Sequence, residues 1–287
     1  MFTCLGNMKL SRALLLASLL FFFPSGLWGQ DKPNPAPVYW QTLSPGLSFL
    51  RWEVRSQHAA VDTIAILRIN PEVWSFRVFF NREPKTIREW QQSTGATVVC
   101  NGGFYRENFL PAGRILVNGT SWGPFKNRHM KGMFLAEPKK GYESHLKATL
   151  IDLKDSTSEE KISFYDQGIQ SFPILLDSKG QVRVNPSSFQ ANRTALAQDR
   201  SGNIYILITE KPFFTLYNLG NYLKESPFGF EFILNLDGGF RTQMLIQIKG
   251  FKYLFTGYVE GNEPSRLFTP EPVRIPSVIG IFPRGRP

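Results

Sequence analysis

The sequence predicts a single α+β domain, built on a mixed β-sheet with a few short crossover helices. Short apolar runs rich in β-branched and aromatic residues recur between turn residues, which is typical of strands. Two segments with helical periodicity interrupt these runs, and no linker divides the chain between residues 46 and 287. The 287 residues are 42% hydrophobic and 14% aromatic, which is enough for a sizeable core.

The first half of this domain alternates strands with one helix. We expect strands in 44–56, 61–70, 74–81 and 96–100, where apolar residues alternate or run together. Segment 85–95 predicts a helix, because Ile87 and Trp90 share one face and Gly95 stands at the C-terminal cap position. The strand that follows this helix ends at the turn 101–104, Asn-Gly-Gly-Phe.

The second half repeats this order of elements. Strand candidates at 203–209 and 230–236 flank a helix candidate at 215–226, and the second strand ends at the turn 237–240, Asp-Gly-Gly-Phe. Between the two units, 172–185 and 192–209 predict hairpins, and 141–163 predicts one strand and a charged loop.

The repeated order predicts where a ligand binds. Each helix candidate is a crossover of about ten residues between two strands, which favours some parallel pairing. The two Gly-Gly turns then follow the carboxyl ends of strands, where open α/β sheets place their ligand crevices. Asp237 in such a turn is either a catalytic carboxylate or a residue that only forms the turn.

Residues 1–29 predict a secretory signal peptide. Lys9 and Arg12 precede the apolar run 13–23, and small and turn-forming residues follow it. The run is too short for a permanent membrane-spanning helix. We expect cleavage near Gly29, then a proline-rich tether over 30–45. The mature protein is expected to be periplasmic or secreted, with no transmembrane anchor after cleavage.

The cysteines exclude a disulfide scaffold. There are two, and Cys4 belongs to the predicted signal peptide, so the mature chain keeps Cys100 alone. Because Cys100 ends an apolar strand candidate, we expect a buried thiol rather than a reactive one.

The charge and the missing motifs narrow the function further. A formal charge of +10 attracts anions, but the basic residues are scattered, so we expect no nucleic-acid partner. The chain lacks the spacings of zinc sites, P-loops and G-x-S-x-G elbows. We therefore predict no cofactor and no defined metal site. Ligation of calcium or magnesium by oxygens of Asp237, Asn235 and turn carbonyls stays open.

Six motifs occur in a characteristic order: "VVCNGGFYRENFLPAGRILVNG", "MKGMFLAE", "QSFPILLDSKG", "NRTALAQDRSGNIYILIT", "FILNLDGGFRTQM" and "PSVIGIFPR". Together they resemble the phosphodiester glycosidase family over about residues 65–284. The resemblance implies an exported hydrolase that cleaves a sugar from a glycosyl-1-phosphodiester at the anomeric C–O bond, in a cell-surface polysaccharide. Its implied partner is a sugar phosphodiester or an anionic glycan.

The resemblance also implies roles for residues of these motifs. Asp237 is the candidate carboxylate beside the anomeric carbon, and Glu210 is the candidate second carboxylate. Arg193 matches a characteristic family arginine whose planar fork suits phosphoryl oxygens. The other candidates for substrate binding are Asn101, Gly102, Gly103, Thr194, Gly238, Gly239 and Arg241. Among these, Asn101 and the amides of Gly102 and Gly103 are expected to contact sugar hydroxyls or phosphate.

Each role has a plainer alternative. Asp237 and Asn101 are the residue types that also form turns, Arg193 suits a surface ion pair, and Glu210 suits a solvated loop. The chain departs from the family at Phe240 and Arg241, where relatives carry small hydroxyl residues. Arg241 either adds a phosphate contact or marks a member without activity. The alternative function is therefore a non-catalytic carbohydrate-binding or exopolysaccharide-assembly protein that retains the crevice.

Overall fold

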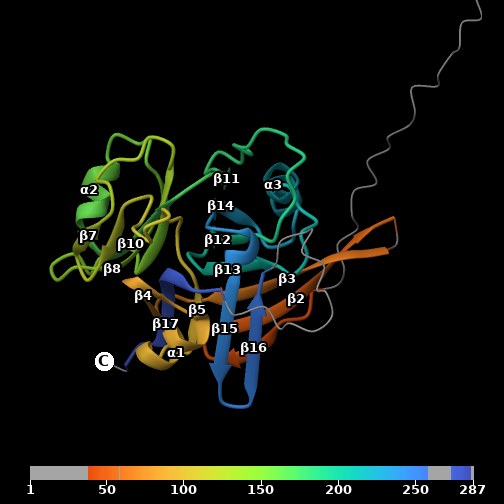
Figure 1. The fold of residues 1–287 in the computed structure, drawn as a ribbon, viewed down its shortest axis with the longest axis horizontal. Coiled ribbons are helices and arrows are strands. Elements are labelled where there is room, and N and C mark those ends of the chain that lie inside the picture. Colours follow the sequence, from red (N-terminus) through yellow and green to blue (C-terminus); the bar gives the residue numbers. More distant parts are fainter. Residues whose placement is uncertain (1–37, 58, 258–272, 286–287) are drawn as a thin grey trace, which may run out of the picture. The chain divides into compact units, whose positions relative to one another are not determined.

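The computed structural model describes residues 38–57, 59–257 and 273–285, so the predicted signal peptide lies outside the described residues. The described strands form three sheets (Figure 1). The first sheet runs in the order β1 (Gln41–Ser44), β2 (Leu47–Ser56), β3 (Ala59–Ile69), β13 (Ile204–Thr209), β12 (Thr194–Asp199), β14 (Phe230–Asn235), β11 (Ile174–Leu176). The second runs β7 (Thr120–Trp122), β6 (Ile115–Val117), β10 (Tyr165–Ser171), β8 (Gly132–Pro138), β9 (Ala148–Asp152). The third runs β16 (Phe251–Thr256), β15 (Gln243–Ile248), β5 (Val98–Asn101), β17 (Ile275–Pro283), β4 (Trp74–Lys85).

The helices are few and short, as expected. They are α1 (Ile87–Thr94), α2 (Ser158–Ser163) and α3 (Leu216–Lys224), with a 3₁₀ turn, η1, at Gly239–Arg241. All described residues belong to one compact unit. The predicted α+β class and the single domain are therefore confirmed. Among the described residues, no helix has the length and apolar character needed to cross a membrane.

One core lies between the inner faces of the three sheets. It contains Leu67 of β3, Phe134 of β8 and Ile279 of β17, each no more than 1% exposed. The outer faces carry separate clusters. Because successive strand residues point to opposite faces, Val98 and Cys100 enter the common core while Val99 faces outward. Cys100 is buried as predicted, and burial raises the pKa of its thiol to about 12.

Each helix covers the outer face of one sheet (Figure 1). Ile87 and Trp90 of α1 pack on the third sheet, Ile162 of α2 on the second, and Leu219 and Leu223 of α3 on the first. Several strands are therefore buried on both faces, which explains the continuous apolar runs in the sequence.

The ends of the two predicted helices are defined locally. The Thr86 hydroxyl accepts the Glu89 amide while the Glu89 carboxylate accepts the Thr86 amide, which forms a capping box at the start of α1. Gly95 ends this helix in the left-handed conformation, as predicted. The Thr215 hydroxyl caps α3 in the same way through the amide of Asn218.

The expected parallel pairing is wrong. Every pair of described strands in the three sheets is antiparallel. Helix α1 does cross from β4 to β5, but β17 lies between these two strands, and β12 lies between β13 and β14 in the same way. The two strands of each unit therefore run in the same direction without being neighbours.

Two local expectations also differ from the structure. Strand β1 lies within the segment that we assigned to the proline-rich tether, since Gln41 pairs with Phe49 of β2. The sheet thus begins before residue 46. Helix α2 lies in the segment that we expected to be a charged loop. The sequence did not predict this helix, because six residues are too few to show helical periodicity. Both predicted hairpin turns are present, at Asp177–Gly180 and Asp199–Asn203.

Replacing Phe134 by alanine tests the common core. Its ring packs edge-on against Phe76 of β4 with centroids 5.4 Å apart, so it joins the second and third sheets. We expect Phe134→Ala to lower the free energy of unfolding by about 3–5 kcal/mol in urea denaturation. The matched change Tyr39→Ala, at a side chain 79% exposed, should cost less than about 0.5 kcal/mol. Equal costs would contradict a core shared by the sheets.

Candidate active site

The two Gly-Gly turns meet through the side chain of Asn101. Asn101 ends β5, and its Nδ2 donates a hydrogen bond of 2.8 Å to the carbonyl oxygen of Asp237, just beyond β14. Its Oδ1 accepts from the Thr194 hydroxyl at 2.8 Å and from the Gln243 amide at 3.0 Å. The side chain is 1% exposed and connects β5, β12, β14 and β15. Asn101 therefore holds the two turns together, and the Thr194 hydroxyl contributes one of its hydrogen bonds.

Asp237 carries a buried carboxylate with one oxygen that accepts no hydrogen bond. Its Oδ1 accepts the Gly238 amide at 3.0 Å, whereas Oδ2 has no hydrogen-bond partner and lies 3.7 Å from Nε of Arg241. The residue is 4% exposed. Burial raises the pKa of Asp237 from 3.8 to about 6, although the Arg241 cation opposes the rise. The carboxylate is therefore ionised at neutral pH but close to its titration.

Arg241 is held between two aromatic rings. Its Nε donates to the Tyr105 hydroxyl at 2.8 Å, and its guanidinium lies 4.6 Å from the ring centroids of both Tyr105 and Phe240. Burial raises the pKa of Tyr105. Tyr105 directly follows the first Gly-Gly turn, so both turns supply side chains to the same cluster.

Arg193 is a buried cation beside the second turn. Its Nη2 donates to the Phe189 carbonyl at 2.8 Å and its Nε to the Phe214 carbonyl at 3.3 Å. Burial lowers the pKa of Arg193 to about 10, so the guanidinium stays charged at neutral pH. Within the described part of the chain it forms no ion pair. A buried guanidinium without a carboxylate partner is suited to an anionic ligand.

The two glycines of the second turn allow Asp237 to lie next to the backbone of Asn192 and Arg193. A Cβ at Gly238 would lie 2.9 Å from the carbonyl oxygen of Asn192 and 3.9 Å from Cα and Cδ of Arg193. Gly239 has a φ of +64° and donates its amide to the Asn192 carbonyl at 2.8 Å. Both positions thus require glycine for Asp237 to lie next to the Asn192–Arg193 backbone.

The first turn differs from our expectation at one amide. Gly102 donates its amide to the Ser277 carbonyl at 2.9 Å, so this amide does not point at a ligand, contrary to the prediction. Among the described residues, no backbone acceptor is found for the amide of Gly103. The amide of Gly103 therefore remains suited to an anion.

Glu210 is not brought against Asp237. Its carboxylate accepts from Nε of Arg51 at 2.9 Å and from the Tyr253 hydroxyl at 2.9 Å, and a second Arg51 nitrogen completes a bidentate pair. The Glu210 side chain is 15% exposed. It follows Thr209, whose amide donates to the Arg193 carbonyl at 3.0 Å, so the two carboxylates stand at the same edge of the first sheet with separate partners.

Several buried oxygen atoms close to Asp237 in the sequence have no hydrogen-bond partner. Asn235 Oδ1, Thr242 Oγ1 and Gln243 Oε1 are buried and accept no hydrogen bond, like Asp237 Oδ2. Such oxygens fit calcium, magnesium or an ordered water. No cluster of three or more His, Cys, Asp or Glu side chains occurs in the described ranges.

Sequence reasoning missed Tyr105 and the partners of Asn235. Tyr105 had a signal, since it continues the Asn-Gly-Gly-Phe turn. The Asn235 contacts had none: its carbonyl accepts from the Ser171 hydroxyl at 2.6 Å and its Nδ2 donates to the Phe172 carbonyl at 3.0 Å. These bonds bring the "QSFP" motif to the same site from more than sixty positions earlier in the chain.

Together, the fold and the site define a class of protein. A buried carboxylate beside a guanidinium group, at the end of a sheet, is compatible with a glycosidase-type hydrolase. The sequence profile described as "Phosphodiester glycosidase" matches residues 94–282, and the chain belongs to this family of glycosidase-type hydrolases. A comparison with curated proteins gave no significant match.

Two solved structures share the fold at low sequence identity. A hypothetical protein from Synechocystis aligns with a TM-score of 0.58 and 16% identity, over 87% of this chain and 64% of its own length. This chain thus spans less than two thirds of that protein. The zebrafish N-acetylglucosamine-1-phosphodiester alpha-N-acetylglucosaminidase catalytic domain, auto-inhibited by its pro-peptide, aligns with a TM-score of 0.55 and 15% identity, over 90% and 85% of the two chains.

The raised pKa of Asp237 predicts a pH dependence of stability. Between pH 3.8 and about 6 the folded chain keeps this proton while the unfolded chain has lost it, so stability falls as the pH rises through this window. Asp237→Asn should abolish this fall in the free energy of unfolding. We expect the free energy of unfolding of the variant, relative to that of the wild type, to rise by up to about 3 kcal/mol from pH 4 to pH 7 in urea denaturation.

The exposed Asp155 supplies the control for this experiment. Its side chain is 57% exposed, so Asp155→Asn should keep a constant difference from the wild type between the two pH values. An advantage of Asp237→Asn that shrinks toward pH 7 would mean that the folded state favours the ionised carboxylate.

Proposed function

We propose that the chain hydrolyses a glycosyl-1-phosphodiester at the anomeric C–O bond and leaves a phosphate monoester. The observation that carries this proposal is the buried carboxylate of Asp237, whose Oδ2 has no hydrogen-bond partner and lies 3.7 Å from Nε of Arg241. Arg193, which forms no ion pair among the described residues, lies with its Cα and Cδ 3.9 Å from the position of a Cβ at Gly238, the residue after Asp237. A carboxylate stabilises positive charge that develops at the anomeric carbon. The guanidinium groups stabilise the negative charge of the departing phosphate.

The reaction requires few proton transfers. A nucleophile adds to the anomeric carbon, the bond from this carbon to the phosphate oxygen breaks, and the electron pair leaves with the phosphate. Because phosphate is a much better leaving group than an alcohol, no strong general acid is needed at this oxygen. Asp237 acts either as the base for an attacking water or as the nucleophile itself, and the anomeric configuration of the released sugar distinguishes these routes.

The remaining residues take supporting roles in this proposal. Arg193 holds the phosphoryl oxygens, with the Gly103 amide as a further donor, and Arg241 lies between Asp237 and the two rings. Asn101, Thr194, Gly238 and Gly239 position the turns. Glu210 remains our candidate for the second carboxylate, acting from the end of β13. Its ion pair with Arg51 fixes the position of its carboxylate, which makes no direct contact with Asp237.

The comparisons support this reaction class. The family profile covers the segment that holds Asn101, Arg193, Glu210 and Asp237. The name of the zebrafish relative describes an N-acetylglucosamine-1-phosphodiester as its substrate. The charged and apolar pattern of residues 9–29 supports export, so the substrate is proposed to be a cell-surface glycan.

One observation favours the alternative of a non-catalytic glycan-binding protein. Arg241 is committed to Tyr105 and Asp237, and Phe240, 38% exposed, extends from the same turn. We infer that this cluster restricts the space for a sugar beside the Asp237 carboxylate. If it excludes the nucleophile, the crevice binds a glycan without cleaving it.

A release assay distinguishes the two functions. We would incubate the purified protein with aryl phosphodiesters of several α-linked sugars, with and without EDTA, and measure sugar release. Activity should fall at least about 10³-fold in Asp237→Asn, since this removes the charge that stabilises the transition state. Saturable binding of a glycan by both proteins, without release by either, would establish the binding protein instead. A loss with EDTA that calcium restores would add a metal to the site.

Arg193→Met separates a binding role from a structural one. Because Arg193 has no carboxylate partner among the described residues, its removal leaves no unpaired charge, but it removes the donors to the carbonyls of Phe189 and Phe214, so we expect about 1–3 kcal/mol of lost stability. The value of kcat/KM should nevertheless fall about 100-fold, through loss of the phosphate contact. The kcat/KM of Arg193→Lys, which keeps the positive charge but not the planar guanidinium, should lie between the values of the wild type and of Arg193→Met. A large loss of stability with unchanged kcat/KM would make Arg193 structural.

A further inference from the structure

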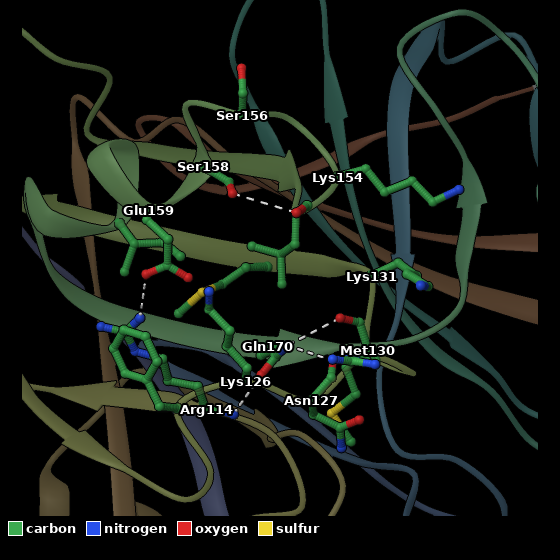
Figure 2. A pocket seen from close by; sticks show the side chains of 15 residues that line it. Arg114, Lys126, Asn127, Met130, Lys131, Lys154, Ser156, Ser158, Glu159 and Gln170 are labelled. Atoms are coloured by element: carbon green, nitrogen blue, oxygen red, sulfur yellow. Dashed lines mark hydrogen bonds and ion pairs between the residues drawn. The ribbon is translucent and has the colours of Figure 1, made fainter.

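The second sheet carries a cationic pocket away from Asp237. This cavity of about 440 Å³ is lined by Arg114, Lys126, Arg128, Lys131 and Lys154, against the single carboxylate of Glu159 (Figure 2). None of the candidate site residues lines it. Its volume falls in the range of pockets that hold small ligands, roughly 300–1,000 Å³.

The positive charge of this pocket is largely uncompensated. Glu159 is already paired with Nη1 of Arg114 at 3.0 Å. In the described ranges, Lys126, Arg128, Lys131 and Lys154 form no ion pair. Cations gathered in one concave surface repel one another and focus a positive potential, which an anion relieves.

The pocket is preorganised by hydrogen bonds of the Gln170 side chain (Figure 2). Gln170 is 5% exposed; its Oε1 accepts the Arg114 amide at 2.8 Å, and its Nε2 donates to the carbonyls of Asn127 and Met130 at 3.2 and 3.0 Å. Asn127 Nδ2 donates in turn to the Ala112 carbonyl at 2.9 Å. The loop that carries Lys126, Arg128 and Lys131 is therefore fixed at two points, which lowers the entropic cost of binding.

Arg114 provides a recessed fork for an oxyanion. Its side chain is 13% exposed, its guanidinium lies 4.4 Å from the Phe125 ring centroid, and its buried Nε donates to no acceptor. An arginine held against a ring keeps its planar guanidinium in a restricted position, as bidentate phosphate binding requires. Because this fork is recessed, a flat anionic membrane is a poorer fit than a compact anionic group.

We propose that this pocket binds a phosphate group on a sugar, as a second anion site of the protein. Met130, Met133, Leu153 and Ile162 also line it, and they offer an apolar surface for the C–H face of a sugar ring. That the bound sugar is part of the substrate glycan rests on the function proposed above. The preference for a phosphorylated sugar rests on the pocket alone.

Strand β10 connects this pocket with the candidate active site. Gln170 lines the pocket, and the next residue, Ser171, donates its hydroxyl to the carbonyl of Asn235, two positions before Asp237. The carbonyl oxygen of Gln170 also lies 3.4 Å from the position of a Cβ at Gly103. A ligand in the pocket thus contacts Gln170, and the adjacent residue of β10, Ser171, supports the turn that carries Asp237.

Isothermal titration calorimetry of the full chain with glucose 6-phosphate tests this proposal. We expect saturable binding that weakens with salt, and none to glucose. Lys126→Gln/Lys131→Gln should weaken the binding at least about tenfold, and Lys249→Gln/Lys252→Gln, two exposed lysines outside the pocket, should change it less than about twofold. Arg193→Met should keep this binding, because it alters only the other anion site.

Three outcomes would overturn the proposal. They are no saturable binding of glucose 6-phosphate, equal weakening by the two lysine pairs, or binding of phosphatidylglycerol vesicles without binding of the sugar phosphate. The second outcome would assign the effect to net charge. Because glucose 6-phosphate has no anomeric phosphate, the titration reads binding without hydrolysis. A chain that binds it through the pocket but releases no sugar from any diester would contradict the proposed function and leave the pocket site standing.

Discussion

The hydrogen bonds of the Asn101 side chain are the constraint on which the candidate site depends. This one carboxamide donates to Asp237 and accepts from Thr194 and Gln243, so it joins its own strand end to Thr194 and to the segment 237–243, which are far apart in the sequence. A net hydrogen bond contributes about 1 kcal/mol, but a buried partner left unpaired costs roughly 1–3 kcal/mol. Any residue other than asparagine at this position leaves several buried groups unpaired at once. The position of the Asp237 carboxylate is therefore a consequence of the position of Asn101.

The sheet topology explains why the two turns reach this point. In each strand–helix–strand unit, an antiparallel strand lies between the two strands that the helix joins: β17 between β4 and β5, and β12 between β13 and β14. The strands of each unit therefore run in the same direction, and each unit ends with a Gly-Gly turn. The crossover therefore brings both turns to the carboxyl ends of strands that run in the same direction within each unit, although no described pair of strands is parallel.

Burial determines the chemistry of the charged groups. Asp237 and Arg193 are both removed from water, which raises the pKa of the carboxyl and lowers that of the guanidinium, yet both stay charged at neutral pH. The Glu210 carboxylate, by contrast, accepts hydrogen bonds from Arg51 and Tyr253. Charged groups also gather in the pocket on the second sheet, where five cationic side chains and one carboxylate line the same cavity. The charge of +10 thus acts locally, in recesses, as well as through the whole surface.

The sequence by itself determined the elements whose causes are local. The helix over Ile87–Thr94, its cap at Gly95, the hairpin turns and the buried Cys100 all follow from residues within one turn or one strand of each other. The ordered motifs determined the family. Strand pairing and side-chain partners were decided only by the tertiary structure. Asn101 and Asp237 are 136 positions apart, and Arg51 and Glu210 are 159 apart. Such contacts depend on how three sheets pack around one core, and no local pattern in the sequence encodes that packing.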